Sequence, residues 1–164
     1  MPMIDLYVPE GALTPEAEEK LVERLTGILV RAEGFEETNE AMRSVTVTWL
    51  HRAPRQFVAG KPADAPRYKV VTTVPEGQLN SESRAWAVAE VAEAVLDAEE
   101  GRWPRNKRRV WVFSPEIPEG QWGSGGVLNP LASILTRVYE PEEARELANK
   151  RIAHSRAERL LLPE

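Results

Sequence analysis

Apolar and polar residues alternate along residues 3–8, a pattern that is typical of a half-buried strand. After a turn, apolar residues return every three or four positions along residues 14–34, which is the period of an amphipathic helix. Thr14 followed by Pro15 and an acidic residue is a favourable helix start. A second alternating run at residues 44–50 predicts another strand. Because a helix connects the two strands, we expect them to be parallel, with a right-handed crossover.

The same unit occurs twice in the chain. The motif Val-Pro-Glu-Gly at residues 8–11 recurs at 74–77, and shifting residues 4–33 by 66 positions gives nine identities in thirty. An internal repeat fixes the architecture before any other argument. The second copy predicts a strand at 67–74, a helix from Asn80 to about Ala98, and a strand at 109–113.

We therefore predict an α/β (α+β) domain in which duplicated β-α-β units form a four-stranded sheet with two helices on one face. The predicted domain covers residues 1–128 and consists of repeats 1–61 and 67–126. Segments rich in proline and glycine at 51–66 and 115–126 predict a hairpin in each copy.

Residues 129–164 have no counterpart in the repeat and predict a helical extension at the C-terminal end. The spacing predicts one helix within residues 128–139 and a charged helix from about 140 to 161. The second helix has a narrow apolar stripe, which indicates packing against one neighbour or against another subunit.

The amino-acid composition and net charge of the chain argue against several classes of function. The chain has 164 residues, a net charge of -5, no cysteine and two histidines, so we expect neither a metal centre nor a thiol nucleophile. The basic segment 102–109 is interpreted as a solvated loop in preference to a phosphate-binding patch. We expect no nucleic-acid partner, no membrane span, no cofactor and a cytoplasmic location.

The first residues and the hairpins carry a resemblance. Proline follows the initiator methionine, a strand ends in Glu-Gly before a capped helix, and residues 122–126 read Trp-Gly-Ser-Gly-Gly. Over about residues 1–128 the chain resembles the tautomerase superfamily. It is similar to its fused two-unit members, such as cis-3-chloroacrylic acid dehalogenase and malonate semialdehyde decarboxylase, and to 4-oxalocrotonate tautomerase-like proteins. The resemblance implies a cofactor-independent enzyme and a homotrimer whose sheets pack inward. We expect the packed face to be apolar around Val45, Val47, Val110 and Val112.

Pro2 is the predicted catalytic residue. If Met1 is removed, Pro2 carries a secondary amine, and an ordinary α-amino group titrates near about 8. Such an amine is a suitable general base for taking a proton from carbon next to a carbonyl, and its protonated form could act as an acid. The alternative is that Pro2 only stops regular structure at the terminus.

Several positions depart from the resembled enzymes. Their arginine after the Glu-Gly turn is replaced by Ala12 and Gln78, and their strand arginine falls at Thr46, with Trp111 as the repeat counterpart. The dehalogenase's helix histidine and strand tyrosine fall at Leu29 and Phe113, and its hairpin glutamate has no clean equivalent, although Glu116 and Glu119 lie nearby in the sequence.

The predicted ligand is a small keto or enol acid. Its binding residues are predicted to be Gln78, Trp111, Phe113, Trp122, Arg52 and Arg55. For the two arginines, surface solvation is the alternative interpretation. Three functions remain open: a tautomerase, a hydratase, dehalogenase or decarboxylase in which Pro2 protonates carbon, and a non-catalytic oligomeric binding protein on the same fold.

Overall fold

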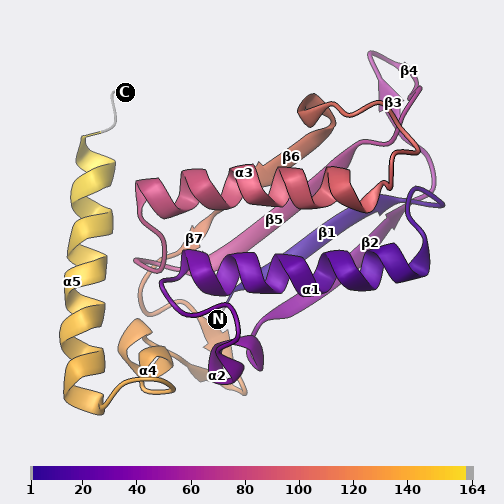
Figure 1. The fold of residues 1–164 in the computed structure, drawn as a ribbon. Helices are drawn as coiled ribbons and strands as arrows, with labels where there is room; N and C mark the ends of the chain where they lie inside the picture. Colours follow the sequence, from indigo (N-terminus) through magenta and orange to yellow (C-terminus); the bar gives the residue numbers. More distant parts are fainter. Residues whose placement is uncertain (1, 162–164) are drawn as a thin grey trace.

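The computed structural model describes residues 2–161. In chain order the elements are β1 (Met3–Pro9), α1 (Pro15–Ala32), α2 (Glu40–Arg43), β2 (Val47–Ala53), β3 (Phe57–Val58), β4 (Lys61–Pro62), β5 (Tyr68–Pro75), α3 (Ser81–Ala98), β6 (Val110–Phe113), β7 (Glu116–Ile117), β8 (Gly123–Ser124), β9 (Val127–Leu128), α4 (Leu131–Leu135) and α5 (Pro141–Leu160). A single 3-10 turn at Lys107–Arg109 precedes β6. Figure 1 shows α1 and α3 side by side over the sheet, with α5 at one end.

The main sheet has the strand order β2-β1-β5-β6, and β7 pairs with β5 beyond the end of β6. β1 and β2 are parallel, β5 and β6 are parallel, and the central pair β1 and β5 is antiparallel. This is the arrangement of two β-α-β units that meet along their first strands. The predicted fold class is therefore confirmed.

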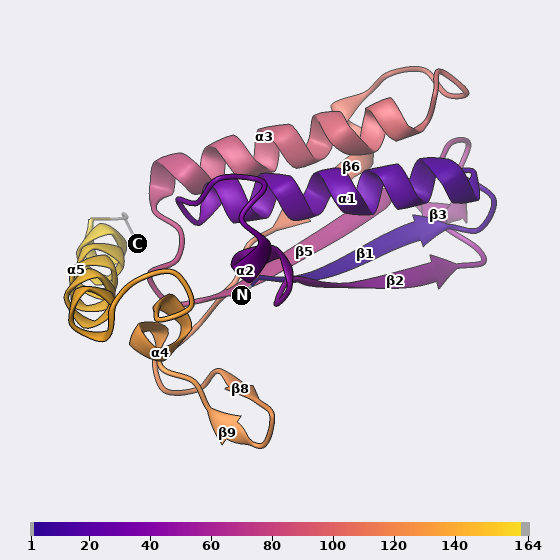
Figure 2. The ribbon, with the colours of Figure 1, turned by 60° about the horizontal axis from the view of Figure 1, so that its bottom comes forward.

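The core lies between the sheet and the two long helices, which cover one face (Figure 2). Ile4, Leu6 and Val8 of β1 are fully buried, whereas the alternate residues of the strand are half-buried on the other face. Both helices begin at capped ends: the Ala17 amide donates to Thr14 Oγ1, and Asn80 and Ser83 form a capping box.

The predicted apolar sheet face was partly wrong. Val110 and Val112 pack against the helical core, because β6 pairs with β5 in a register that turns Trp111 and Phe113 to the open face. Val45 precedes β2 and packs in a small cluster with Trp122. The open face is formed by exposed large side chains of β2 and β6: Val47, Trp49, Trp111 and Phe113.

Two predicted element bounds also differ from the structure. β2 begins at Val47 and not at Ser44, because the amides of Ser44 and Thr46 donate to carbonyls of α2. Within 115–126, β7 runs parallel to β5, and only residues 123–128 form a hairpin, which projects away from the rest of the molecule in Figure 2.

The C-terminal extension is the predicted pair of helices, α4 and α5. α5 crosses the end of the sheet where α1 ends and α3 begins (Figure 1). The apolar residues of α4 and α5 form a second cluster with the end of α1 and with α2. The buried members of this cluster are Val30, Phe35, Met42, Leu131, Leu135, Ala144 and Ala148.

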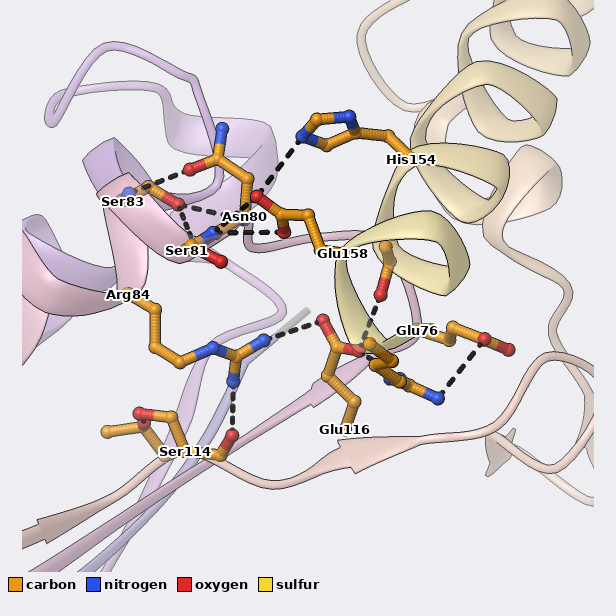
Figure 3. Close-up of polar contacts among 12 residues, drawn as sticks. Glu76, Asn80, Ser81, Ser83, Arg84, Ser114, Glu116, His154 and Glu158 are labelled. Carbon is orange, nitrogen blue, oxygen red and sulfur yellow. Dashed lines mark hydrogen bonds and ion pairs between the residues drawn. The ribbon is translucent and has the colours of Figure 1, made fainter. Parts of the chain in front are cut away.

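Ion pairs hold the other side of α5. Glu76 accepts from Arg156 at 3.0 and 3.2 Å, and Glu116 accepts from Arg84, Ser155 and Arg159. Figure 3 shows Arg84 directed at both Glu116 and the Ser114 carbonyl. Among residues 2–161, no helix combines the length and the apolar character that crossing a membrane requires.

Candidate functional site

Pro2 is buried directly before β1, in the middle of the sheet. Its carbonyl accepts a hydrogen bond from the Val47 amide at 3.4 Å, so β2 lies on one side. On the other side, Met3 pairs with Thr73 of the antiparallel strand β5, so the end of β5 lies next to Pro2. The turn from β5 to α3 therefore begins at the same end of the sheet as the proline.

This turn contains Gln78 and is held tightly. Gly77 has φ +82, a conformation that favours glycine, and a Cβ added there would lie 2.9 Å from the Ile152 amide nitrogen of α5. Gln78 is only 4% exposed. Its Oε1 accepts from Arg151 Nη1 at 2.8 Å, while its Nε2 is buried and has no hydrogen-bond acceptor among residues 2–161.

Arg151 brings a positive charge from α5 to this end of the sheet. Its Nη1 also donates to the Glu33 carbonyl at 3.0 Å, and its guanidinium lies 5.7 Å from the centre of the Phe35 ring. Burial lowers the pKa of the Arg151 guanidinium, and the negative charge of Glu33 opposes that shift. In the described part of the chain, Arg151 makes its hydrogen bonds to neutral acceptors.

Glu33 and Glu99 occupy equivalent positions in the two copies. Each caps the C-terminal end of its long helix, and each is 1% exposed. Glu99 accepts from Tyr68 Oη at 2.9 Å, and both of its carboxylate oxygens accept from Arg109 at 2.5 Å. A shift of 66 residues relates Tyr68 to Pro2 and Glu99 to Glu33. The repeat therefore predicts that the Glu33 carboxyl faces the proline.

The environment of Glu33 favours its neutral form. Burial raises the pKa of the Glu33 carboxyl, and nearby positive charge, including Arg151, opposes the shift. A buried carboxyl that the repeat directs at an amine has the character of an acid/base group.

A cavity of about 440 Å³ opens between the end of α1, the turn after β5, and α5. Its wall includes Glu33 and Gln78, together with four basic side chains: Arg31, Lys150, Arg151 and His154. Pro2 does not line it. The volume is within the range of small-molecule sites.

The aromatic residues of the predicted site are divided between two places. Trp122 is buried and packs with Met3 and Val45, so it lies near the start of β1 and hence near Pro2. Trp111 and Phe113 lie on the open face of the sheet and are about half exposed.

Arg52 and Arg55 lie at the other end of the strands from Pro2. Arg52 pairs with Val8 in the β1–β2 register and forms a two-pronged ion pair with Glu18 of α1. The Arg55 guanidinium lies 5.0 Å from the centre of the Phe57 ring. Neither arginine is brought to the proline of its own chain, so their predicted role depends on a neighbouring chain.

Sequence reasoning missed Glu33 and Arg151. Glu33 could have been found, because it is one of the nine identities of the repeat. Arg151 lies outside the repeat, and its place beside Gln78 depends on how α5 packs. No group of three or more histidine or acidic side chains suited to a metal ion occurs in residues 2–161.

Comparison with known proteins identifies the fold. No family model matches the sequence, and no curated protein matches it. Solved structures do match: native fused 4-OT aligns with a TM-score of 0.64 at 18% identity, over 77% of this chain and 94% of that chain. The chain has the fused 4-OT fold.

Two further structures agree with this assignment. The R7 fused 4-OT wild type asymmetric trimer aligns with a TM-score of 0.62 at 19% identity, over 77% of this chain and 94% of that chain. Macrophage migration inhibitory factor of Toxoplasma gondii aligns with a TM-score of 0.58 at 15% identity, over 77% of this chain and 98% of that chain. The three structures share one fold with this chain, which is the fold that the sequence predicted.

Proposed function

We propose that this protein is a cofactor-independent, tautomerase-type enzyme that uses the amine of Pro2 as a general acid and base on a small keto or enol acid. The observation that carries the proposal is the placement of Pro2: it is buried, and it shares one end of the sheet with Gln78 and the buried Glu33. The fused 4-OT fold supports it.

The chemistry follows from a free amine in this place. Once Met1 is removed, the Pro2 nitrogen has a lone pair, and apolar residues that pack with the adjacent Met3, such as Trp122 and Val45, favour its neutral form. The amine takes a proton from carbon next to the substrate carbonyl, and the electrons of the broken C–H bond form the C=C bond of an enolate. The resulting ammonium then returns a proton to the substrate, which completes the tautomerisation.

We also propose that residues 1–128 form the catalytic domain and that the active form is a homotrimer. The fused 4-OT structures described as trimers support this assembly. In such an assembly Trp111, Phe113, Arg52 and Arg55 would contribute to the site of another chain, because none of them lies beside its own Pro2.

The decisive experiment blocks the Pro2 nitrogen without changing any side chain. We would compare a chain that begins at Pro2 with one that carries a Gly-Ser extension before Pro2, both checked by intact mass. Phenylenolpyruvate ketonisation should occur only with the free amine, because an acylated nitrogen cannot accept a proton. Pro2→Ala, which keeps a primary amine, should lower kcat/KM by about 10²–10⁴-fold.

A control and a chemical probe complete this test. Pro54→Ala changes an exposed loop proline and should leave activity unchanged. A related structure is that of Pt0534 inactivated by 2-oxo-3-pentynoate, and the same reagent should label the Pro2 peptide of this chain and not that of the extended chain. Full activity with the extension present would reject Pro2 and favour a binding protein. Halo-acrylate hydrolysis in place of ketonisation would favour the dehalogenase alternative.

A further inference from the structure

We propose that α5 completes a carboxylate-binding site in which Arg151 and Gln78 together hold the carboxylate of a small 2-oxo acid. The choice of a 2-oxo acid rests on the proposed function, whereas the carboxylate itself is inferred from the side chains. The site lies outside the duplicated unit, since Arg151 belongs to the C-terminal extension.

The first argument is the state of Arg151. Arg151 is partly buried, yet its hydrogen bonds go to the Glu33 carbonyl and the Gln78 side-chain oxygen, which are neutral. A desolvated cation is costly unless an anion or further acceptors compensate it. A guanidinium presents five N–H donors in a planar fork that matches a carboxylate, so donors remain for a ligand.

The second argument is independent and comes from Gln78. Its Nε2 carries two donors and is buried, and the described part of the chain offers no acceptor within hydrogen-bond distance. The side chain is nine-tenths buried and lines the cavity that Arg151 also lines. Buried donors are almost always paired in native proteins, so an unpaired donor on a side chain that lines a cavity indicates an acceptor that the ligand supplies.

The amide is also rigidly placed. The turn before it packs closely against α5, because even a Cβ added at Gly77 would lie 2.9 Å from the Ile152 amide nitrogen. The Gln78 oxygen is fixed by Arg151, which directs the nitrogen away from the guanidinium. A carboxylate could therefore accept from Gln78 Nε2 through one oxygen and from Arg151 through the other.

The charge around the cavity fits an anion. The chain as a whole is acidic, with a net charge of -5, yet four basic side chains line this one cavity. His154 is paired with Glu158 at 3.3 Å and Arg31 with Glu37 at 3.2 Å, which leaves Lys150 and Arg151 as the basic lining side chains without an ion pair among residues 2–161. Local positive charge of this kind attracts an acidic ligand.

A structural clasp is the competing explanation. By bonding to the Glu33 carbonyl and to Gln78, Arg151 ties α5 to the end of α1 and to the turn after β5. A clasp explains these two hydrogen bonds. It explains neither the unpaired Gln78 nitrogen nor the open cavity, so binding of a ligand separates the two explanations.

The test compares two ligands that differ only at the carboxylate position. Phenylpyruvate and phenylacetone, in which a methyl group replaces the carboxylate, are titrated calorimetrically into the full chain. We expect phenylpyruvate to bind at least tenfold more tightly. Arg151→Met should remove that advantage and leave phenylacetone binding unchanged. Arg145→Met, an exposed change on the same helix, is the matched control and should behave as the unmodified chain.

A second variant keeps the test decisive if Arg151→Met does not fold. Gln78→Glu places a carboxylate of nearly the same shape beside Arg151, so it should raise Tm and abolish phenylpyruvate binding. Equal binding of the two ligands, or phenylpyruvate binding that survives Arg151→Met or Gln78→Glu, would overturn the proposal. Pro2→Ala separates it from the catalytic proposal, because that variant should lose turnover and keep phenylpyruvate binding.

Discussion

At the scale of single residues, the position in the second copy that corresponds to Pro2 is part of a buried polar cluster around Glu99. Tyr68 and Arg109 both donate to the Glu99 carboxylate, and all three side chains are almost completely buried. Burial and the Glu99 carboxylate raise the pKa of the Tyr68 hydroxyl, so it stays protonated and remains a donor. This polar cluster is structural.

Removing the charge of Glu99 should therefore be costly. Glu99→Gln leaves the Arg109 guanidinium buried without an anion, and breaking a buried pair in this way typically costs about 3–5 kcal/mol of unfolding free energy. Urea unfolding of the full chain measures it. The neighbouring exposed change Glu100→Gln should cost little. A loss below about 1 kcal/mol for Glu99→Gln would show that the pair is not essential to the core.

The sequence predicted single residues unevenly. It indicated Gln78 as a candidate at the turn after the third predicted strand, because the repeat aligns the position with Ala12. It did not predict the guanidinium that lies against Gln78, because residues 78 and 151 are joined only through the packing of α5. A repeat relates positions within its own units, and it carries no information about a segment that follows them.

At the scale of elements, α5 is fastened by acidic residues of the sheet end. The hydrogen bonds from Arg156 hold the pKa of the Glu76 carboxyl below its ordinary value; burial opposes this, and the Glu119 amide and the charge of Arg159 add to the lowering. The Glu76 side chain is 4% exposed, so it is well shielded from solvent. The docking of α5 therefore depends on the ionised form of this carboxyl.

As the pH falls, α5 should detach from the end of the sheet before the remainder of the protein unfolds. A carboxyl whose pKa is lowered on folding contributes stability above its ordinary value of about 4.3, and this contribution is lost as the pH falls through the folded value. We expect protease cleavage within α5 to rise below about pH 4 in the unmodified chain. Glu76→Gln should show raised cleavage already at pH 7, and Glu142→Gln, exposed on α5, should not. Cleavage that does not depend on pH would contradict this role.

Element boundaries were predicted from the sequence where local signals decide them. The caps Thr14 and Asn80 start α1 and α3 as the sequence indicated. The sequence predicted incorrectly which side chains of β6 point to the helices. A four-residue strand of large apolar residues has no polar side from which its orientation could be read. Its register against β5 decides that Trp111 and Phe113 point away from the helices.

At the scale of the whole molecule, one face of the sheet has no helix over it (Figure 2). Large apolar side chains of β2 and β6 lie exposed there, including Trp49 at 45%, Trp111 at 47% and Phe113 at 51%. Large exposed apolar side chains on an uncovered sheet face indicate an interface. The trimeric fused 4-OT structures have the same fold.

A charge in this face should separate the chains. Trp111→Glu puts a carboxylate where the proposed trimer would bury it, so sedimentation at micromolar concentration should change from a trimer to a monomer. Val88→Glu makes a comparable change on the exposed side of α3, away from this face, and should remain trimeric. A monomeric unmodified chain, or a trimeric Trp111→Glu variant, would contradict the proposed assembly.

Tyr68 stands in the second copy where Pro2 stands in the first. This difference limits the number of terminal proline amines per chain. An amino terminus exists once per chain, and the corresponding corner of the second copy is filled by the Tyr68, Glu99 and Arg109 side chains. An assembly built from separate single-unit chains would present one terminal amine for every β-α-β unit. In this chain every second unit is without one, and the position that corresponds to the proposed catalytic proline is occupied there by side chains that stabilise the fold.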